Sequence, residues 1–280
     1  MLQIRPIRTG DLRPILRLTG EEDWGFGIRD LRRMRLLEPR GCLVAALDTR
    51  IIGFTTAISY GKKLGWVGNV VVQRSHRRKG VGSRLVASAI DHLRRSHVMS
   101  IALNSYPESQ PMYERLGFVA FDGFVTLSMS IGAFQPAKRM ERTPFRGILN
   151  LDKRAFGADR TRLLRSLFNE FPNAWAWIAE TSNVVGYSLV KDYERSSEIG
   201  PAISEQRGED AIATLLRFSI SLARKWPLEV SVPESNETAL RIAKSLGFEV
   251  QRRGVVMRLH DLREITINPA VVALGFLDKG

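Results

Sequence analysis

One order of predicted elements occurs twice in the sequence, and this repeat limits the fold more than any other feature. Residues 112–118 read M-Y-E-R-L-G-F and residues 242–248 read I-A-K-S-L-G-F, each near the end of a similar series of strands and helices. A shared L-G-F alone could arise by chance, because a helix often ends in glycine before an apolar strand. The matching order of elements is therefore the stronger evidence for a repeat. We predict two copies of one α/β fold, each a mixed twisted sheet flanked by helices.

The length of 280 residues suits two domains. Residues 132–143, rich in Pro, Lys and Arg, predict a linker. This gives an N-terminal domain at residues 1–135 and a C-terminal domain at residues 136–280. Among the local predictions are a helix that begins at Ser83, a strand pair around Asp122-Gly123 and a strand that ends at Ile199.

Composition indicates a soluble globular protein, with 44% hydrophobic and 25% charged residues. The longest apolar runs, such as residues 42–47, fall far short of the roughly 20 residues that span a membrane. The N-terminus lacks the apolar core of a secretory signal, so we expect a cytoplasmic protein without a membrane partner. The lone Cys42 lies in an apolar run, which favours a buried thiol over a catalytic one.

The net charge of +13 is unevenly distributed. Residues 1–138 hold 21 basic and 11 acidic residues, net +10, whereas residues 139–280 hold 21 and 18, net +3. The first half is therefore expected to bind an anionic ligand, although a solvated arginine-rich face is the alternative. Nucleic acid is disfavoured as a partner, because no recognised motif and no aromatic interleaving accompany the basic residues.

A glycine turn in the first half has the form of an anion site. A strand containing Val70, Val71 and Val72 leads to R-R-K-G-V-G at residues 77–82, and an amphipathic helix follows. The first N–H groups of a helix lack partners, and glycines let them approach a phosphate closely. The spacing matches neither a Walker loop nor a dinucleotide-binding turn, which would need a third glycine. A tight turn without a ligand is the alternative.

The sequence resembles the GNAT superfamily of N-acetyltransferases. The family motif [Q/R]-x-x-G-x-[G/A] matches Arg77, Gly80 and Gly82, and a tyrosine four residues before G-F matches Tyr113. More narrowly, the chain is similar to tandem members with a degenerate C-terminal copy. That likeness is carried by E-E-D-W at 21–24, Y-E-R-L-G-F at 113–118, A-F-G-A-D-R at 155–160 and I-G-P-A at 199–202.

The resemblance implies an acetyl-CoA-dependent N-acetyltransferase that acts on a primary amine by direct attack in a ternary complex, without a metal. It implies donor contacts along the strand and through the turn, at Val70, Val71, Val72, Arg77, Arg78, Lys79, Gly80, Val81, Gly82 and Ser83. Tyr113 is the implied general acid for the leaving thiolate, or else a packed core tyrosine. Glu21, Glu22 or Asp23 is the candidate base, unless this loop is merely solvated.

Several other side chains have two interpretations. Trp24 and Phe26 line an acceptor pocket or cover the core. Asn69 is a minor candidate for orienting a water, and His76 is expected to face solvent instead of acting in catalysis. In the second half, the corresponding turn has Gly208 without a second glycine, and the acids Glu209 and Asp210 would repel a pyrophosphate. We therefore expect no second donor site there. Substrate contacts or packing are the alternatives for Trp175, Tyr187 and Lys191.

Two functions besides acetyl transfer stay open. The chain is a sensor that binds acyl-CoA without turnover, or a basic module for polyanions or nucleic acid built on this fold. The acceptor amine belongs to a small molecule or to a protein, and the chain is a monomer or a homodimer.

Overall fold

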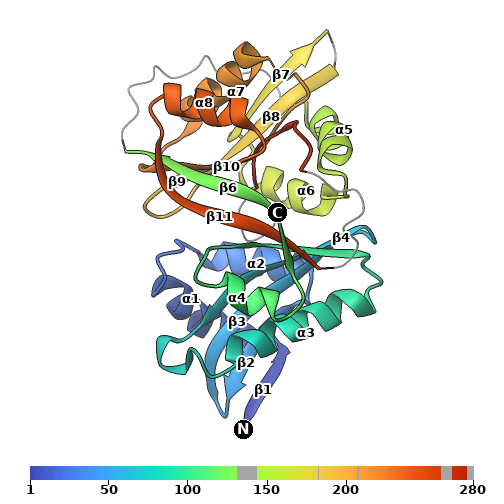
Figure 1. Ribbon diagram of the computed structural model, residues 1–280, viewed down its shortest axis with the longest axis vertical. Helices are drawn as coiled ribbons and strands as arrows, with labels where there is room; N and C mark the ends of the chain where they lie inside the picture. The colour runs from blue at the N-terminus through green and yellow to red at the C-terminus, as the bar shows by residue number, and fades with distance from the viewer. Residues whose placement is uncertain (131–143, 182, 207, 260–266, 276–280) are drawn as a thin grey trace. The chain divides into compact units, whose positions relative to one another are not determined.

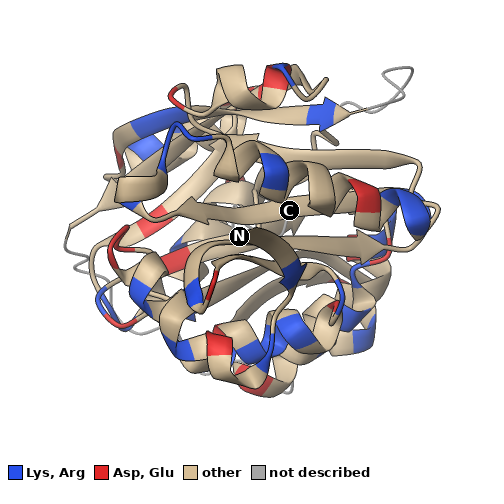
Figure 2. Ribbon diagram, turned by 90° about the horizontal axis from the view of Figure 1, so that it is seen from below, with Lys and Arg blue, Asp and Glu red and all other residues tan. Residues whose placement is uncertain are grey.

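The computed structural model describes residues 1–130, 144–181, 183–206, 208–259 and 267–275. Contacts divide the chain into two compact units. Most of their helices and strands are labelled in Figure 1, and Figure 2 marks the Lys, Arg, Asp and Glu residues along the ribbon. Unit 1 holds Met1–Ala120 and a segment that begins at Met257, and unit 2 holds Phe121–Val256 and a segment that begins at Glu264. The linker expected at 132–143, and with it the domain boundary expected at 135/136, lies outside the described residues.

Unit 1 is a mixed sheet with the strand order β1-β2-β3-β4-β5. Neighbours are antiparallel except β4 and β5, which are parallel. The strands are β1 (Leu2–Pro6), β2 (Cys42–Leu47), β3 (Arg50–Tyr60), β4 (Leu64–Val72) and β5 (Ser100–Ser105). The helices are α1 (Leu12–Gly20), α2 (Ile28–Leu37), α3 (Val81–Arg95) and α4 (Gln110–Glu114), with 3-10 turns η1 (Thr9–Asp11) and η2 (Arg74–His76).

Two adjacent positions of β3 show how the helices cover this sheet. Phe54 packs in one cluster with Ile15 of α1 and Met34 of α2. A Cβ at neighbouring Gly53 would instead lie 2.9 Å from Cδ1 of Leu85 in α3. Because successive side chains of a strand point to opposite faces, α1 and α2 cover one face of the sheet and α3 covers the other.

Unit 2 has the strand order β6-β10-β9-β8-β7, with β12 beside β9. Strands β9 and β10 are parallel, and the other pairs are antiparallel. The strands are β6 (Val119–Met129), β7 (Trp175–Glu180), β8 (Asn183–Asp192), β9 (Ser197–Ser204), β10 (Leu228–Pro233) and β12 (Val271–Ala273), and β11 (Glu249–Leu259) ends in unit 1. The helices are α5 (Phe145–Phe156), α6 (Thr161–Glu170), α7 (Glu209–Leu222) and α8 (Glu237–Ser245). The mixed α/β architecture predicted for both halves is confirmed.

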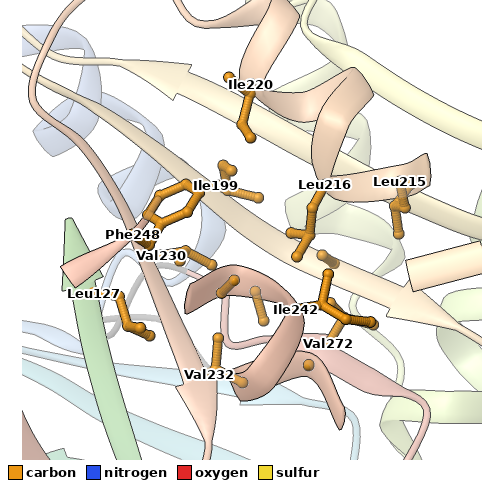
Figure 3. Close-up of a cluster of buried hydrophobic side chains, with 14 of the residues drawn as sticks. Leu127, Ile199, Leu215, Leu216, Ile220, Val230, Val232, Ile242, Phe248 and Val272 are labelled. Carbon is orange, nitrogen blue, oxygen red and sulfur yellow. The ribbon is translucent and has the colours of Figure 1, made fainter. Parts of the chain in front are cut away.

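The core of unit 2 lies between its central strands and the helices α7 and α8 (Figure 3). Leu216 of α7 and Ile242 of α8 are buried together with Ile199 of β9 and Val230 of β10. In the described part of the chain, no helix combines the length and the hydrophobicity needed to cross a membrane.

Three local predictions differ from the structure. The strand pair expected around Asp122-Gly123 is wrong, because β6 is one continuous strand. Gly123 provides space there: its carbonyl accepts from the N–H of Glu234 at 2.8 Å, and the Glu234 side chain occupies the position where a Cβ would lie. Strand β9 continues past Ile199 to Ser204, and α3 begins at Val81, two residues before Ser83.

A buried polar cluster connects α5, the start of α6 and β8 in unit 2. Asp152 Oδ1 accepts from Arg160 and from the Tyr187 hydroxyl, both at 2.5 Å. The Arg160 and Asp152 side chains are only 1% and 2% exposed. Tyr187 and Trp175 also contact each other, at 6.1 Å between ring centroids, and Lys191 is buried with its ammonium over the Tyr193 ring. Trp175, Tyr187 and Lys191 are therefore core residues of unit 2.

Asp152→Ala should lower the free energy of unfolding by about 3–5 kcal/mol, because it leaves the buried Arg160 charge without its carboxylate. Glu205→Ala is the control, since it removes an exposed carboxylate 3.0 Å from Arg154 and should cost no more than about 1 kcal/mol. Urea unfolding of the full chain measures both values. Equal losses would contradict a structural role for the buried cluster.

Candidate functional site

The parallel pairing of β4 with β5 ends before either strand does. Leu64, Gly65 and Trp66 pair with Ser100, Ile101 and Ala102, and β4 then continues to Val72 without β5. None of the described strands pairs with this edge of β4 instead. Backbone N–H and C=O groups require partners, so the edge at residues 67–72 is suited to bind an extended ligand. It contains Val70, Val71 and Val72, the predicted donor contacts.

Strand β4 also carries a bulge, which alternation in the sequence does not reveal. Phe54 pairs with Val71 and Thr56 with Gly68, so Asn69 and Val70 together oppose one residue of β3. Asn69 has a φ of 55°, in the left-handed region. Its Nδ2 donates to Thr56 Oγ1 at 2.9 Å and to Met34 Sδ at 3.2 Å. A bulge bends its strand and increases the twist, here at Asn69 and Val70.

The glycine turn leads from β4 into α3 with the backbone geometry of an anion site. Gly80 caps the helix with φ 76° and ψ 0°, and Arg78 also has a positive φ. A Cβ at Gly82 would lie 3.1 Å from Met112 Sδ and 3.8 Å from Val72 Cγ2. The turn therefore brings together the end of β4, the start of α3 and helix α4. The first amides of the helix belong to Val81, Gly82 and Ser83, among the predicted phosphate contacts.

The basic side chains of this turn have intramolecular partners. Lys79 Nζ donates to the Ser75 carbonyl at 2.9 Å, and Arg77 Nε donates to the Val72 carbonyl at 2.9 Å. Arg78 is exposed. Arg77 and Lys79 thus each donate to a backbone carbonyl that precedes the turn.

Arg74 of η2 and Arg77 of the turn hold the loop between α1 and α2 through Glu22, an arrangement that we call the Glu22 clasp. Arg77 donates to Glu22 Oε1 at 2.5 Å and Arg74 Nε to the same oxygen at 3.4 Å. Arg74 also donates to the Glu21 carbonyl at 2.8 Å. Sequence reasoning missed Arg74, which lies outside the family motif, and it named Glu22 as one of three candidate bases. The structure instead pairs the Glu22 carboxylate with two guanidinium groups.

The other acceptor-side candidates lie close by in the same loop. The Glu21 side chain is exposed, and Asp23 has a left-handed φ of 53°. Trp24 and Phe26 contact each other edge to face, with centroids 5.6 Å apart, and both pack against the cluster under α1 and α2. His76 is partly exposed and contacts Ser75.

Tyr113 is the buried member of the candidate set. It lies on α4, next to the Met112 that approaches Gly82, and it is 6% exposed. Its ring packs edge to face on Phe118, with centroids 6.0 Å apart. Burial raises the pKa of the Tyr113 hydroxyl well above its usual value near 10, so the phenol keeps its proton at neutral pH. Cys42 is buried as expected, and burial raises the pKa of its thiol to about 12.

The matching region of unit 2 is filled by the chain itself. The parallel pairing of β9 with β10 ends at Ile199 and Val230, and β9 then pairs with β12 through Ile203 and Val271. The next residue after β12, Leu274, donates its N–H to the Ser231 carbonyl of β10 at 2.8 Å. Strand β12 therefore contacts both strands where they separate.

The helix start of unit 2 also differs from that of unit 1. Gly208 caps α7 in an extended conformation, with φ −67° and ψ 145°, and the first turn contains Glu209 and Asp210. Glu209 pairs with Arg241 at 2.8 Å. Carboxylates in the first turn satisfy the helix dipole and oppose a bound anion. Ala243 takes the place of Tyr113 in the repeat. Among the described residues, no group of three His, Cys, Asp or Glu is arranged to hold a metal.

Comparison with protein families gives two matches that together cover most of the chain. Residues 10–118 match the model described as Acetyltransferase (GNAT) family, and residues 148–266 match a second model described as Acetyltransferase (GNAT) domain. Among curated proteins, the chain is 25% identical over 245 residues to an uncharacterized N-acetyltransferase, YitH, of Bacillus subtilis, covering 84% of this chain and 83% of the relative. It is 21% identical over 235 residues to the holothin acyltransferase of a Pseudoalteromonas species, covering 81% and 78%.

Solved structures share the fold at low sequence identity. A putative acetyltransferase from Pyrococcus horikoshii has a TM-score of 0.83 at 21% identity, covering 100% of this chain and 96% of that one. A GCN5-related N-acetyltransferase from Sphaerobacter thermophilus has a TM-score of 0.69 at 17% identity, covering 98% and 97%. A tandem GNAT protein of clavulanic acid biosynthesis has a TM-score of 0.61 at 14% identity, covering 92% and 98%. With GNAT matches in both halves and this shared fold, the chain belongs to the GNAT acetyltransferase family as a tandem member and is an acyl-CoA-dependent N-acyltransferase.

Proposed function

We propose that the chain transfers an acetyl group from acetyl-CoA to a primary amine, by direct attack within a ternary complex at a site in unit 1. The observation that carries this proposal is the unpaired edge of β4, which is followed along the chain by η2, the glycine turn and the start of α3. An edge of this kind accepts amides of the pantetheine arm in the manner of an added strand. The amides of Val81, Gly82 and Ser83 then face the pyrophosphate, with Arg78 exposed beside them.

The bulge at Asn69 supports a role for Val70–Val72 in polarising the thioester. Backbone N–H groups that point at the carbonyl oxygen stabilise the negative charge that develops there during attack. A bulge interrupts the regular ladder and redirects backbone groups, and it commonly occurs next to active sites. We assign these amides as the donors to the thioester oxygen.

Proton transfers in the proposed reaction use one buried and one exposed group. The neutral amine attacks the carbonyl carbon, a C–N bond forms, and the C–S bond breaks when the tetrahedral intermediate collapses. Tyr113, a phenol that is protonated at neutral pH, gives its proton to the departing thiolate. Glu21 accepts the amine proton through water, because its side chain is exposed whereas Glu22 is held in the clasp.

Gly82→Glu should abolish stabilisation by acetyl-CoA. The wild-type melting temperature is expected to rise by several degrees with saturating acetyl-CoA, because a ligand that binds only the folded state stabilises it. In the variant, a carboxylate enters the pyrophosphate position, and its Cβ lies within 3.1 Å of Met112 Sδ. Gly10→Glu is the control of equal charge, since a Cβ there meets nothing within 4 Å. The proposal fails if the wild type shows no shift.

Tyr113→Phe should lower kcat by about 100-fold or more, the usual contribution of a positioned general acid, and change the Kd for coenzyme A by less than about twofold. The phenyl ring keeps the contact with Phe118, so the fold is retained. Steady-state kinetics and calorimetry give the two numbers. Unchanged kcat would remove Tyr113 from the mechanism.

Glu22→Gln should tighten coenzyme A binding by up to about fivefold, because it releases Arg77 and Arg74 for the phosphates at the cost of a surface ion pair. Glu21→Gln is the matched control: it should leave the affinity unchanged and lower turnover. Calorimetric titration with coenzyme A measures the affinities. Weaker binding by Glu22→Gln would show that the clasp organises the turn instead of competing with the ligand.

A further inference from the structure

A cavity of about 620 Å³ lies in unit 1 between β1, β2 and the C-terminal half of α3. Its volume is in the range of small-molecule sites, roughly 300–1,000 Å³. The lining residues come from four segments: Ile4, Arg5 and Pro6; Glu38 and Arg40; Leu43; and Ser88, His92, Arg95 and Ser96. The glycine turn precedes the N-terminus of α3, whereas this cavity contacts α3 from Ser88 onward. The proposed acetyl transfer uses none of these residues.

One wall of the cavity is apolar and the opposite wall is polar. Pro6 pairs with Leu43, and Ile4 lies two residues before Pro6, so the three share one face of the sheet. On α3, Ser88, His92 and Arg95 are spaced by four and three residues, which places them along one stripe of the helix. A helix that buries Leu85, Ala89 and Leu93 thus presents a polar stripe at this sheet edge.

The segment that carries Glu38 and Arg40 is fixed against β3. The Ala57 N–H donates to the Gly41 carbonyl at 2.8 Å, and a Cβ at Gly41 would lie 2.0 Å from the Ala57 carbonyl oxygen. Glu38 Oε2 accepts from the Ser59 hydroxyl at 2.6 Å, and Oε1 lies 3.3 Å from His92 Nε2. Burial alone would raise the pKa of Glu38, but hydrogen bonds from His92 and Ser59 bring it below its usual value. The Glu38 carboxylate therefore has hydrogen-bond partners within the wall.

The cationic groups of the cavity differ in what they already bind. Arg5 is held by Asp11 through two hydrogen bonds, at 2.7 and 3.0 Å. Arg95 uses Nε on the Asp91 carbonyl, and no further hydrogen bond of its guanidinium is found among the described residues. For Arg40, the described part of the chain provides no hydrogen bond or ion pair. Guanidinium groups with free donors suit carboxylates, which accept two parallel N–H bonds.

We propose that this cavity binds a small monocarboxylate with an apolar chain, whose carboxylate meets Arg40 and Arg95 while its chain covers Ile4, Pro6 and Leu43. Arg40 and Arg95 bring two positive charges and Glu38 brings one negative charge, so one further negative charge from the ligand balances these three side chains. A compact anion such as inorganic phosphate would leave the apolar wall uncovered. The site is separate from the acetyl donor site and does not depend on turnover.

The test is methyl-detected NMR of the full chain with saturating coenzyme A, titrated with hexanoate. Ile4 and Leu43 methyl signals should shift with saturation at millimolar hexanoate, and neither acetate nor hexylammonium should reproduce the shifts. Arg40→Ala with Arg95→Ala should weaken hexanoate binding about tenfold or more. The control Arg13→Ala removes an exposed charge of α1 outside the cavity and should leave binding unchanged.

Ser88→Trp provides a second variant, which fills the cavity without changing its charge and should also abolish the shifts. The proposal is overturned if hexanoate leaves Ile4 and Leu43 unperturbed in the wild type. It is equally overturned if inorganic phosphate binds better than hexanoate, or if the shifts persist in both cavity variants. Because the readout is binding at named methyl groups, failure of the proposed acetyl transfer would not affect it.

Discussion

The separation of β4 from β5 after Trp66 is the constraint on which the functional site depends. A parallel pair that continued to Val72 would satisfy the backbone groups of that edge and leave nothing for a ligand to bind. The bulge at Asn69 and the left-handed Gly80 act on the same segment, one redirecting the strand and the other starting α3. The open edge of β4 and the start of α3 lie on either side of η2 in the chain, and both carry backbone N–H groups that a ligand can bind.

Unit 2 provides an internal comparison, because it repeats the fold and closes the same edge. Strand β12 pairs with β9 beyond Ile199, and acids occupy the first turn of α7. The corresponding strand edges of the two units therefore differ. In unit 1 the backbone groups of β4 are available to a ligand, and in unit 2 those of β9 pair with β12, a segment from later in the chain. Unit 2 also keeps a buried polar cluster in which Asp152 accepts hydrogen bonds from Arg160 and Tyr187.

The structural features that the sequence could predict depend on short stretches of chain. Glycines at 80 and 82 and the apolar spacing of α3 locate the turn and helix without reference to distant residues. The bulge was hidden because the apolar run at 70–72 has no alternation from which a register could be read. The Glu22 clasp joins residues 52 and 55 positions apart, and no local pattern encodes that pairing. Asp122-Gly123 has turn chemistry, yet here glycine makes room for Glu234.

The central claim is that one of the two GNAT units binds the donor and the other does not. Isothermal titration of the full chain with acetyl-CoA tests it most directly, because the stoichiometry counts donor sites irrespective of the acceptor. One donor site in unit 1 and none in unit 2 give an expected stoichiometry of one molecule bound per chain. Two molecules per chain would contradict the closed edge of β9 in unit 2, and no binding would contradict the open edge of β4 in unit 1.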